Sequence, residues 1–300
     1  MQNIVTLIVN TSKQILDERI INKAFMAIEK KGGAVSNLSW LAKDEACDIF
    51  FDDIKPQEAY DIIRQKLDGI EVDIVVQENN MRKKKMLISD MDSTIIQQEC
   101  IDEIADKLNL KNKVAAITER AMNGELDFSQ SLRERVGLLG GLDANKLDDV
   151  YKNNIEIMPG AETLVRTMKK HGAYCLLVSG GFTFFTDKIA GRLGFDENRA
   201  NILEINDGKL TGKVVEPILD KDSKLEALEE VASKLSIRKS DAIAVGDGAN
   251  DLPMLKNAGV GVAYYAKESV QEQVACRINY SDLTALLYIQ GYKKEEFVKG

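Results

Sequence analysis

Three short apolar runs of the sequence each end in polar residues that could take part in catalysis. In a sheet of parallel strands, ligands bind outside the carboxyl ends of the strands. We therefore expect Asp90, Ser179 and Asp247 to meet in one pocket, although they are far apart in the sequence. The runs and the residues after them are Met86–Ser89 before Asp90 and Asp92, Leu176–Val178 before Ser179, Gly180 and Gly181, and Ala244–Gly246 before Asp247, Asn250 and Asp251.

These residue types suit the transfer of a phosphoryl group. A phosphate ester resists attack by anions, so its charge must be neutralised and the nucleophile held in line. Carboxylates at Asp90 and Asp247 could hold Mg²⁺, which prefers oxygen ligands. Asp90 and Asp92 lie two residues apart, and on an extended segment their side chains point the same way. One carboxylate can then attack phosphorus while the other protonates the leaving alcohol.

Ser179 and the two residues after it could bind phosphate oxygens. We expect Ser179, with the amides of Gly180 and Gly181, to open a helix, and helix N-termini bind anions. Lys224, at the start of another predicted helix, could supply positive charge, and the nearby Lys221 competes for this role. Each motif alone also occurs in ordinary turns, helix caps or solvated helix faces. Their joint occurrence after three separate apolar runs indicates a catalytic site.

Other catalytic classes find little support in the sequence. A Ser-His-Asp triad would depend on His171, the single histidine of the chain, which lies at the end of a predicted helix and suits a helix-end cation. The nucleotide-binding pattern GxxxxGK[ST] does not occur, nor does GxGxxG after a strand. The segment Gly246–Asn250 resembles half of a dinucleotide-binding loop but has no third glycine.

From Met86 onward, short apolar runs alternate with helical stretches. This pattern is typical of a doubly wound (Rossmann-like) parallel sheet with helices on both faces. The segment from about 98 to 157 has helical periodicity and no clear strand, and it is too long for a loop. We interpret it as an inserted helical cap on an α/β domain of residues 81–300. Asn206–Gly208 predicts a hairpin turn, and the polar tail beyond Ile289 is expected to fray.

Residues 1–80 are predicted to form a small α+β domain of their own. Their order of strands and helices, βαββαβ, is that of a ferredoxin-like fold, and Glu78–Lys85 makes a polar, then basic, linker. Because every catalytic motif follows Ser89, a chain starting near Arg82 is expected to fold and stay active. The predicted strands are Asn3–Val9, Ala34–Leu41, Glu45–Phe51 and Glu71–Val76.

Composition and charge indicate a globular protein without a nucleic-acid partner. The chain has 300 residues, 44% hydrophobic and 29% charged, with a net charge of −8, whereas nucleic-acid binding leaves a basic footprint. No apolar run approaches the ~20 residues of a membrane span, and the first residues do not resemble a signal peptide. The four cysteines form no CxxC pair, so neither zinc nor disulfides are expected. We expect a cytoplasmic protein without membrane contact.

Four motifs, which follow one another along the chain between Asp90 and Asp251, resemble the four ordered motifs of the haloacid dehalogenase superfamily. Two further stretches, Asp90–Asp106 and Glu119–Leu139, are similar to the phosphoserine phosphatase family, and the resemblance covers residues from about 85 to 290. The N-terminal unit looks like the ACT-like regions found on some members. The four motifs are Asp90–Thr94, Ser179–Phe182, Lys224 and Gly246–Asp251.

The resemblance implies a role for each motif residue in an aspartyl-phosphate mechanism. Asp90 is similar to the family's nucleophile, and Asp92 to its general acid and base. The carboxylates of Asp90 and Asp247, with the backbone carbonyl of Asp92, would ligate Mg²⁺, and Asp251 would support them. The positions that match phosphate or substrate contacts are Ser179, Gly180, Lys224 and Asn250.

The resemblance also implies how the cap would recognise a free amino acid. Glu99 matches the residue that takes the substrate's ammonium group, and Arg135 matches the one that takes its carboxylate. A planar guanidinium suits a carboxylate better than an ammonium does. Met122 and Phe128 match apolar walls of the pocket.

The implied activity is hydrolysis of phosphoserine to serine and phosphate, the last step of serine biosynthesis. A rival is the same chemistry on another small phosphomonoester, or phosphoryl transfer to a second alcohol. A further rival is an amino-acid-binding regulatory protein whose phosphatase domain is inactive, although the set of catalytic residues is intact. The sequence leaves open whether the protein forms a homodimer.

Overall fold

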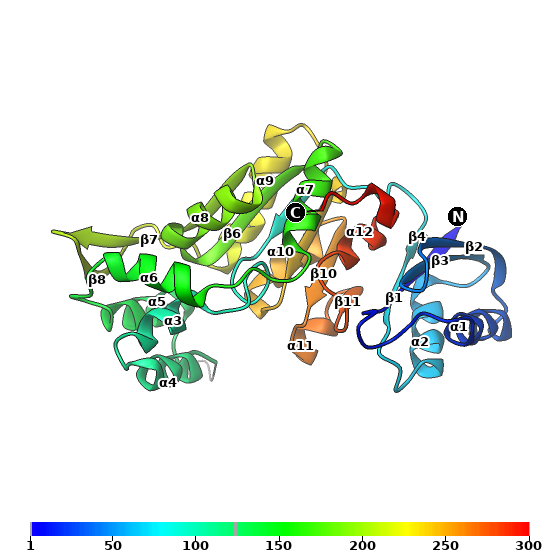
Figure 1. Cartoon of the computed structure of the whole chain (residues 1–300), viewed down its shortest axis with the longest axis horizontal. Coiled ribbons are helices and arrows are strands. Elements are labelled where there is room, and N and C mark those ends of the chain that lie inside the picture. Colours follow the sequence, from blue (N-terminus) through cyan, green and yellow to red (C-terminus); the bar gives the residue numbers. More distant parts are fainter. Residues whose placement is uncertain (1, 123–124, 300) are drawn as a thin grey trace.

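The computed structural model describes residues 2–122 and 125–299, without the side chains of Met122 and Lys221. The chain forms two sheets, a small one near the N-terminus and a large one from Met86 onward (Figure 1). Among the described residues, no helix is both long and apolar enough to cross a lipid bilayer.

The large sheet has seven strands in the order β11-β10-β9-β5-β6-β7-β8. All pairs are parallel except β7 with β8, which form the hairpin predicted at Asn206–Gly208. β5 lies between β6 and β9, so the strands that precede Asp90, Ser179 and Asp247 are neighbours. The strands are β5 (Met86–Ser89), β6 (Tyr174–Phe182), β7 (Glu197–Asn206), β8 (Lys209–Val215), β9 (Ala242–Gly246), β10 (Val260–Tyr264) and β11 (Cys276–Ile278).

Helices cover both faces of this sheet, which confirms the predicted doubly wound α/β class. In β5, Leu87 packs in the core under α7, α8 and α12, while Met86 and Ile88 pack in the core under α9 and α10. Successive residues of a strand face opposite sides, so a strand buried on both faces reads as one apolar run. The helices are α7 (Ala161–Lys170), α8 (Thr183–Leu193), α9 (Lys221–Lys234), α10 (Leu252–Asn257), α11 (Glu268–Gln271) and α12 (Ala285–Ile289).

Four helices lie between β5 and α7, below the large sheet in Figure 1. An isolated antiparallel bridge between Ile96 and Ile157 joins the two ends of this insertion. Asp127 caps α5 by accepting a hydrogen bond from the amide of Gln130, and the side-chain oxygen of Gln130 accepts one from the amide of Asp127. This arrangement fixes a helix start. We propose that the four helices form the cap; they are α3 (Cys100–Asp106), α4 (Lys111–Met122), α5 (Phe128–Gly137) and α6 (Asn145–Asn154).

The N-terminal residues form an antiparallel sheet of order β2-β3-β1-β4 with two helices on one face. This confirms the predicted βαββαβ order, whereas the resemblance to ACT-like regions stays a prediction. In β1, Val5 and Leu7 pack against the helices, while Ile8 points the other way and joins the core of the large sheet. The elements are β1 (Asn3–Ile8), α1 (Glu18–Lys30), β2 (Ala34–Ala42), β3 (Ala46–Asp52), α2 (Pro56–Lys66) and β4 (Asp73–Glu78).

Arg82 connects the two sheets through a buried cluster of polar contacts. Its Nη1 lies 2.7 Å from Asp48 Oδ2 in β3, and the two side chains are only 10% and 3% exposed. Its Nε and Nη2 also donate to the carbonyls of Ile289 and Tyr288 at the end of α12. A buried guanidinium with this many partners fixes the junction between the two sheets. Arg82 therefore has a structural role that the predicted linker did not include.

Arg82→Met is expected to lower the free energy of unfolding by about 3–5 kcal/mol, because it leaves the buried carboxylate of Asp48 without its partner. Urea or guanidinium unfolding of the full chain measures this change. Lys83→Met is the matched control. Lys83 pairs with Glu296 at an exposed site, and such pairs contribute only about 0–1 kcal/mol. Equal losses in the two variants would contradict the role given to Arg82.

The C-terminal tail packs against the body as far as Val298, contrary to the expectation of a frayed tail. Tyr292 is 1% exposed, and its ring lies 4.9 Å from the ring of His171. The amide of Val298 donates to Thr167 of α7. His171 caps the end of α7, which is the helix-end position that the sequence predicted.

Candidate active site

A cavity of about 650 Å³ lies between the carboxyl ends of β5, β6 and β9 and the helices α3, α4 and α5. Its apolar wall includes Ile101, Leu132 and Phe128, and the ring of Phe128 lies over Gly180, where a Cβ atom would come within 3.1 Å of it. The candidate site residues in the lining are Asp90, Asp92, Glu99, Arg135, Gly180, Asp247 and Asn250.

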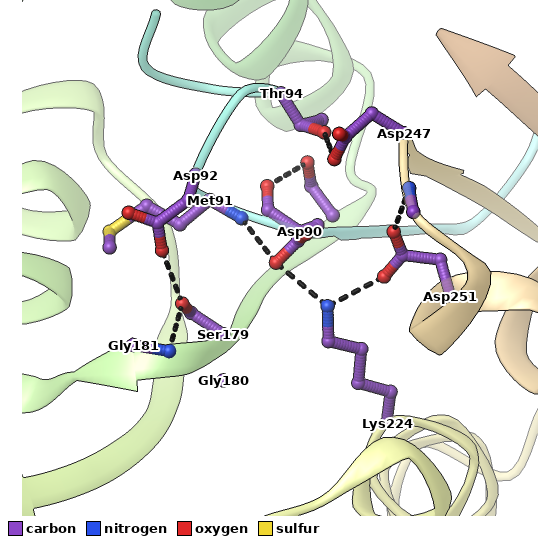
Figure 2. Close-up of polar contacts among 12 residues, drawn as sticks. Asp90, Met91, Asp92, Thr94, Ser179, Gly180, Gly181, Lys224, Asp247 and Asp251 are labelled. Carbon is purple, nitrogen blue, oxygen red and sulfur yellow. Dashed lines mark hydrogen bonds and ion pairs between the residues drawn. The ribbon is translucent and has the colours of Figure 1, made fainter. Parts of the chain in front are cut away.

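Asp90 directly follows β5 and is held by Lys224 (Figure 2). Lys224 Nζ lies 2.8 Å from Asp90 Oδ1 and 2.6 Å from Asp251 Oδ1, and it is 1% exposed. Asp90 Oδ1 also accepts the amide of Met91 at 2.8 Å, whereas Oδ2 has no hydrogen bond within the described residues. One oxygen of Asp90 is therefore fixed and the other is available for chemistry.

Asp92 is held by both of its carboxylate oxygens. Oδ1 accepts the amide of Cys100, the first residue of α3, at 2.8 Å. Oδ2 accepts the hydroxyl of Ser179 at 2.9 Å (Figure 2). The Ser179 hydroxyl in turn accepts the amide of Gly181. A Cβ atom at Gly181 would lie 2.8 Å from Asp92 Oδ2, so this position leaves no room for a side chain.

Asp90, Asp247 and Asp251 bring carboxylate oxygens within 4.8 Å of one another. Burial, followed by the Asp251 carboxylate, raises the pKa of Asp90 well above its usual range. The same two causes raise the pKa of Asp247 to about 6. Lys224 supplies one positive charge against three carboxylates, so these residues fit a divalent cation, which binds oxygen ligands and lowers such pKa values. Both oxygens of Asp251 are already bonded, to Lys224 and to the amide of Gly248.

Glu99 precedes α3 and faces the cavity from the cap side. The hydroxyl of Ser93 donates to Glu99 Oε1 at 2.6 Å. The side chain is exposed to the cavity, yet the surrounding wall removes much of its hydration. This desolvation, followed by the Asp92 carboxylate, raises the pKa of Glu99 to about 7.

Arg135 lies on α5 and brings the cap's guanidinium into the same cavity. Its one hydrogen bond within the described residues runs from Nε to the carbonyl of Ser131 at 3.3 Å. The rest of its guanidinium is free to bind an anion. Glu99 and Arg135 thus place one negative and one positive group above Asp90. Phe128 lines the cavity as predicted, and the side chain of Met122 is outside the described part of the chain.

One expectation about the phosphate-binding residues needs correction. Ser179–Gly181 does not open a helix, because β6 continues to Phe182 and α8 begins at Thr183. Ser179 and Lys224 are buried behind the cavity lining and bond to Asp92, Asp90 and Asp251. Lys221, the competing lysine, lies outside the described side chains.

The sequence did not indicate two hydroxyl groups that orient carboxylates of the site, those of Glu99 and Asp247. Ser93 holds Glu99, as described above, and Thr94 Oγ1 donates to Asp247 Oδ1 at 3.3 Å (Figure 2). Both residues directly follow Asp92, and Ser93 has a positive φ of 54°, which turns the chain toward the cap. Their place after the Asp-x-Asp pair is the signal that could have identified them.

Residues 87–256 match the family model of the haloacid dehalogenase-like hydrolases, and the chain belongs to this family. A curated relative, the phosphoserine phosphatase of Polaromonas sp., is 47% identical over 224 residues, which cover 73% of this chain and 95% of that protein.

Two solved structures extend this comparison. The unliganded form of a probable phosphoserine phosphatase from Vibrio cholerae superposes with a TM-score of 0.79 at 31% identity and covers 98% of this chain and 88% of its own. A substrate-bound phosphoserine phosphatase gives a TM-score of 0.64 at 41% identity over 69% of this chain and 98% of its own. The first likeness includes the N-terminal sheet, because it spans nearly the whole chain.

Proposed function

We propose that this protein hydrolyses O-phospho-L-serine to L-serine and phosphate through an aspartyl phosphate on Asp90. The observation that carries the proposal is one cavity with Asp90 at its base and both Glu99 and Arg135 on its cap side. An amino acid offers an ammonium and a carboxylate, and this pair offers the opposite charges. The phosphoserine phosphatases among its relatives support the same substrate. The experiment is to measure phosphate release from a panel of phosphorylated amino acids.

In the first step, Asp90 attacks phosphorus and the serine oxygen leaves. Lys224 fixes the other oxygen of Asp90 at 2.8 Å, which orients the carboxylate for in-line attack. Asp92 gives its proton to the leaving oxygen. The bonds from Cys100 and Ser179 hold Asp92 in place for this transfer.

In the second step, water attacks the aspartyl phosphate and regenerates Asp90. Asp92, now ionised, takes a proton from this water as a general base. Gly180 and Asn250 line the cavity where the phosphate oxygens would lie. The apolar cap wall limits access of bulk water, which strengthens the electrostatic interactions inside the cavity.

Mg²⁺ is the cofactor that we propose for the carboxylates of Asp90 and Asp247 and the backbone carbonyl of Asp92. When bound, it would neutralise phosphate charge and keep Asp90 ionised. We also propose a cytoplasmic location, because the four cysteines are all free and buried and suit a reducing compartment.

Removal of divalent cations by chelation is expected to abolish phosphate release, because the negative charge of the phosphate and of the carboxylates around it is then not neutralised. Addition of Mg²⁺ should restore the activity. Ca²⁺ is the control cation, since it takes more ligands at longer distances and should restore less. Full activity after exhaustive chelation would contradict the proposed cofactor.

The kcat/KM for phosphoserine is expected to fall as the pH drops through about 7. Glu99 has its pKa raised to about 7, so it is ionised above this pH and neutral below it. Only the ionised form attracts the substrate's ammonium group. A pH profile between 6 and 8.5 measures the effect.

Glu99→Gln is the matched variant for this profile, because it is isosteric and cannot ionise. It should have a lower kcat/KM at pH 8 and should lose the part of the pH dependence that belongs to Glu99. Ionisation of the substrate phosphate, with a second pKa of about 6, affects both enzymes equally. Superimposable profiles for the two enzymes would assign the titration to another group.

A further inference from the structure

The β7–β8 hairpin extends one edge of the large sheet and lies beside the cap (Figure 1). Its outer strand, β8, packs against α5, the helix that carries Arg135. Leu203 and Leu210 of the hairpin are buried in one core cluster with Val136 of α5. The hairpin and the cap helix therefore share an apolar core.

The outer side of β8 is hydrogen-bonded to the cap segment that follows α5. A strand at the edge of a sheet leaves main-chain groups on its outer side without partners, and here the cap supplies them. The amide of Gly141 donates to the carbonyl of Leu210 at 2.8 Å, and the amide of Leu210 donates to the carbonyl of Leu142 at 2.8 Å. The amide of Ala144 donates to the carbonyl of Gly208 at 2.8 Å. Main-chain bonds thus join the cap directly to the sheet.

The strand β8 and the end of α5 also approach each other closely at Gly212. A Cβ atom at Gly212 would lie 3.3 Å from the carbonyl oxygen of Gly137 and 3.3 Å from the Cα atom of Gly140. Both neighbours are main-chain atoms, which cannot rotate away as a side chain can. Gly137 is the last residue of α5 and follows Arg135 by two residues. The spacing between β8 and the end of α5 therefore depends on the missing side chain at Gly212.

The position of Arg135 depends on α5, because its one hydrogen bond within the described residues runs to Ser131 of the same helix. We propose that the β7–β8 hairpin positions the Arg135 guanidinium over the cavity, with Gly212 as the positioning residue. The inference rests on the proposed function, in which Arg135 binds the substrate carboxylate. A displacement of the last turn of α5 moves Arg135 with it. The hairpin then determines how well the enzyme recognises an amino-acid carboxylate.

The test measures kcat and KM of Gly212→Ala for phosphoserine and for an aryl phosphate, which has no carboxylate for Arg135. The added methyl group pushes β8 and the end of α5 apart. Misplacement by about 1 Å can cost roughly a hundredfold, so we expect the ratio of kcat/KM for phosphoserine to kcat/KM for the aryl phosphate to fall roughly tenfold. The fall should come from KM for phosphoserine, because the carboxylate is bound equally before and during the reaction. An unchanged ratio in the folded variant would overturn the proposal.

Gly208→Ala is the matched control within the same hairpin. Gly208 has a φ of 75° and Gly212 has a φ of 81°, so alanine suffers similar backbone strain at both positions. A Cβ atom at Gly208 would meet no atom of the described residues within 4 Å. The control should therefore keep the ratio of the unmodified protein. An equal fall in both variants would assign the effect to strain in the hairpin and would contradict the role of the contact at Gly212.

Leu210→Val is the second variant, and it takes the place of Gly212→Ala if that protein does not fold. It removes one methylene group from the core that the hairpin shares with the cap, and valine suits a strand. The ratio should fall in the same direction but by less than in Gly212→Ala. A folded Leu210→Val protein with an unchanged ratio would count against the hairpin as the support of Arg135.

The double variant Gly212→Ala with Arg135→Ala shows whether the hairpin acts through Arg135. Two changes that act through one group are not additive, so the double variant should have the same ratio as Arg135→Ala alone. A further fall in the double variant would mean that the hairpin acts on another part of the site. If Arg135→Ala alone leaves the ratio unchanged, the proposed substrate contact fails and this inference fails with it. If only Gly212→Ala leaves the ratio unchanged, the proposed function stands and this inference is overturned.

Discussion

Asp90→Asn is expected to lower kcat for phosphoserine hydrolysis by roughly four orders of magnitude or more, the scale seen when a nucleophile is removed. The amide has nearly the same shape as the carboxylate but is a poor nucleophile. The variant should remain folded, because Asp90 is buried beside two other carboxylates and loses a charge that burial disfavours. Phosphate release and thermal unfolding, measured on the same sample, check both expectations.

Asp207→Asn is the matched control for this variant. Asp207 lies in the β7–β8 turn with a φ of 48°, a backbone conformation that asparagine tolerates, and it lies outside the cavity. This control should keep full activity. Substantial hydrolysis by a well-folded Asp90→Asn protein would mean that another group attacks phosphorus.

Arg135→Ala is expected to impair phosphoserine hydrolysis much more than hydrolysis of an aryl phosphate. Arg135 is free to bind the substrate carboxylate, and an aryl phosphate has no such carboxylate. Loss of a charge-assisted hydrogen bond costs about 1.5–3 kcal/mol, or roughly tenfold to a hundredfold in kcat/KM. The ratio of kcat/KM for the two substrates is the measurement, because a folding defect would lower both together.

Arg133→Ala supplies the control for Arg135→Ala. It lies on the same helix and pairs with Glu216 at an exposed site, so it should leave the ratio unchanged. If Arg135→Ala lowers both activities equally in a stable protein, the arginine supports the active site as a whole. If neither activity changes, Arg135 is an ordinary surface cation and the substrate assignment loses its main residue.

The strand-end residues of the site could be predicted because they depend on a local rule. Apolar runs buried on both faces mark parallel strands, and polar residues after such strands meet at one edge. Asp90, Ser179 and Asp247 accordingly come together. The hydrogen bonds from the Cys100 amide to Asp92 and from the Ser93 hydroxyl to Glu99 could not be predicted, since they depend on how the cap meets the sheet.

The fold could be predicted where elements are long enough to show a period. β11 has three residues and α12 has five, which is too short for a helical or strand pattern. The junction at Arg82 was also missed, because the sequence Glu78–Lys85 reads as an ordinary basic linker. Since Ile8 and other N-terminal residues join the larger core, a chain starting at Arg82 is now expected to be less stable than the sequence suggested.

Much of the junction between the two sheets is made by main-chain groups on the catalytic side. Arg82 and Gln77 bond to the carbonyl of Ile289, and Asp73 bonds to the amides of Asn279 and Ser281. Main-chain groups are the same whatever residue occupies a position. Mutational drift on the catalytic side can therefore change side chains there without breaking these bonds. Correlated substitutions between the N-terminal sheet and the catalytic side would therefore be sparse at such contacts. A contact map inferred from sequence variation would under-represent the junction between the two sheets.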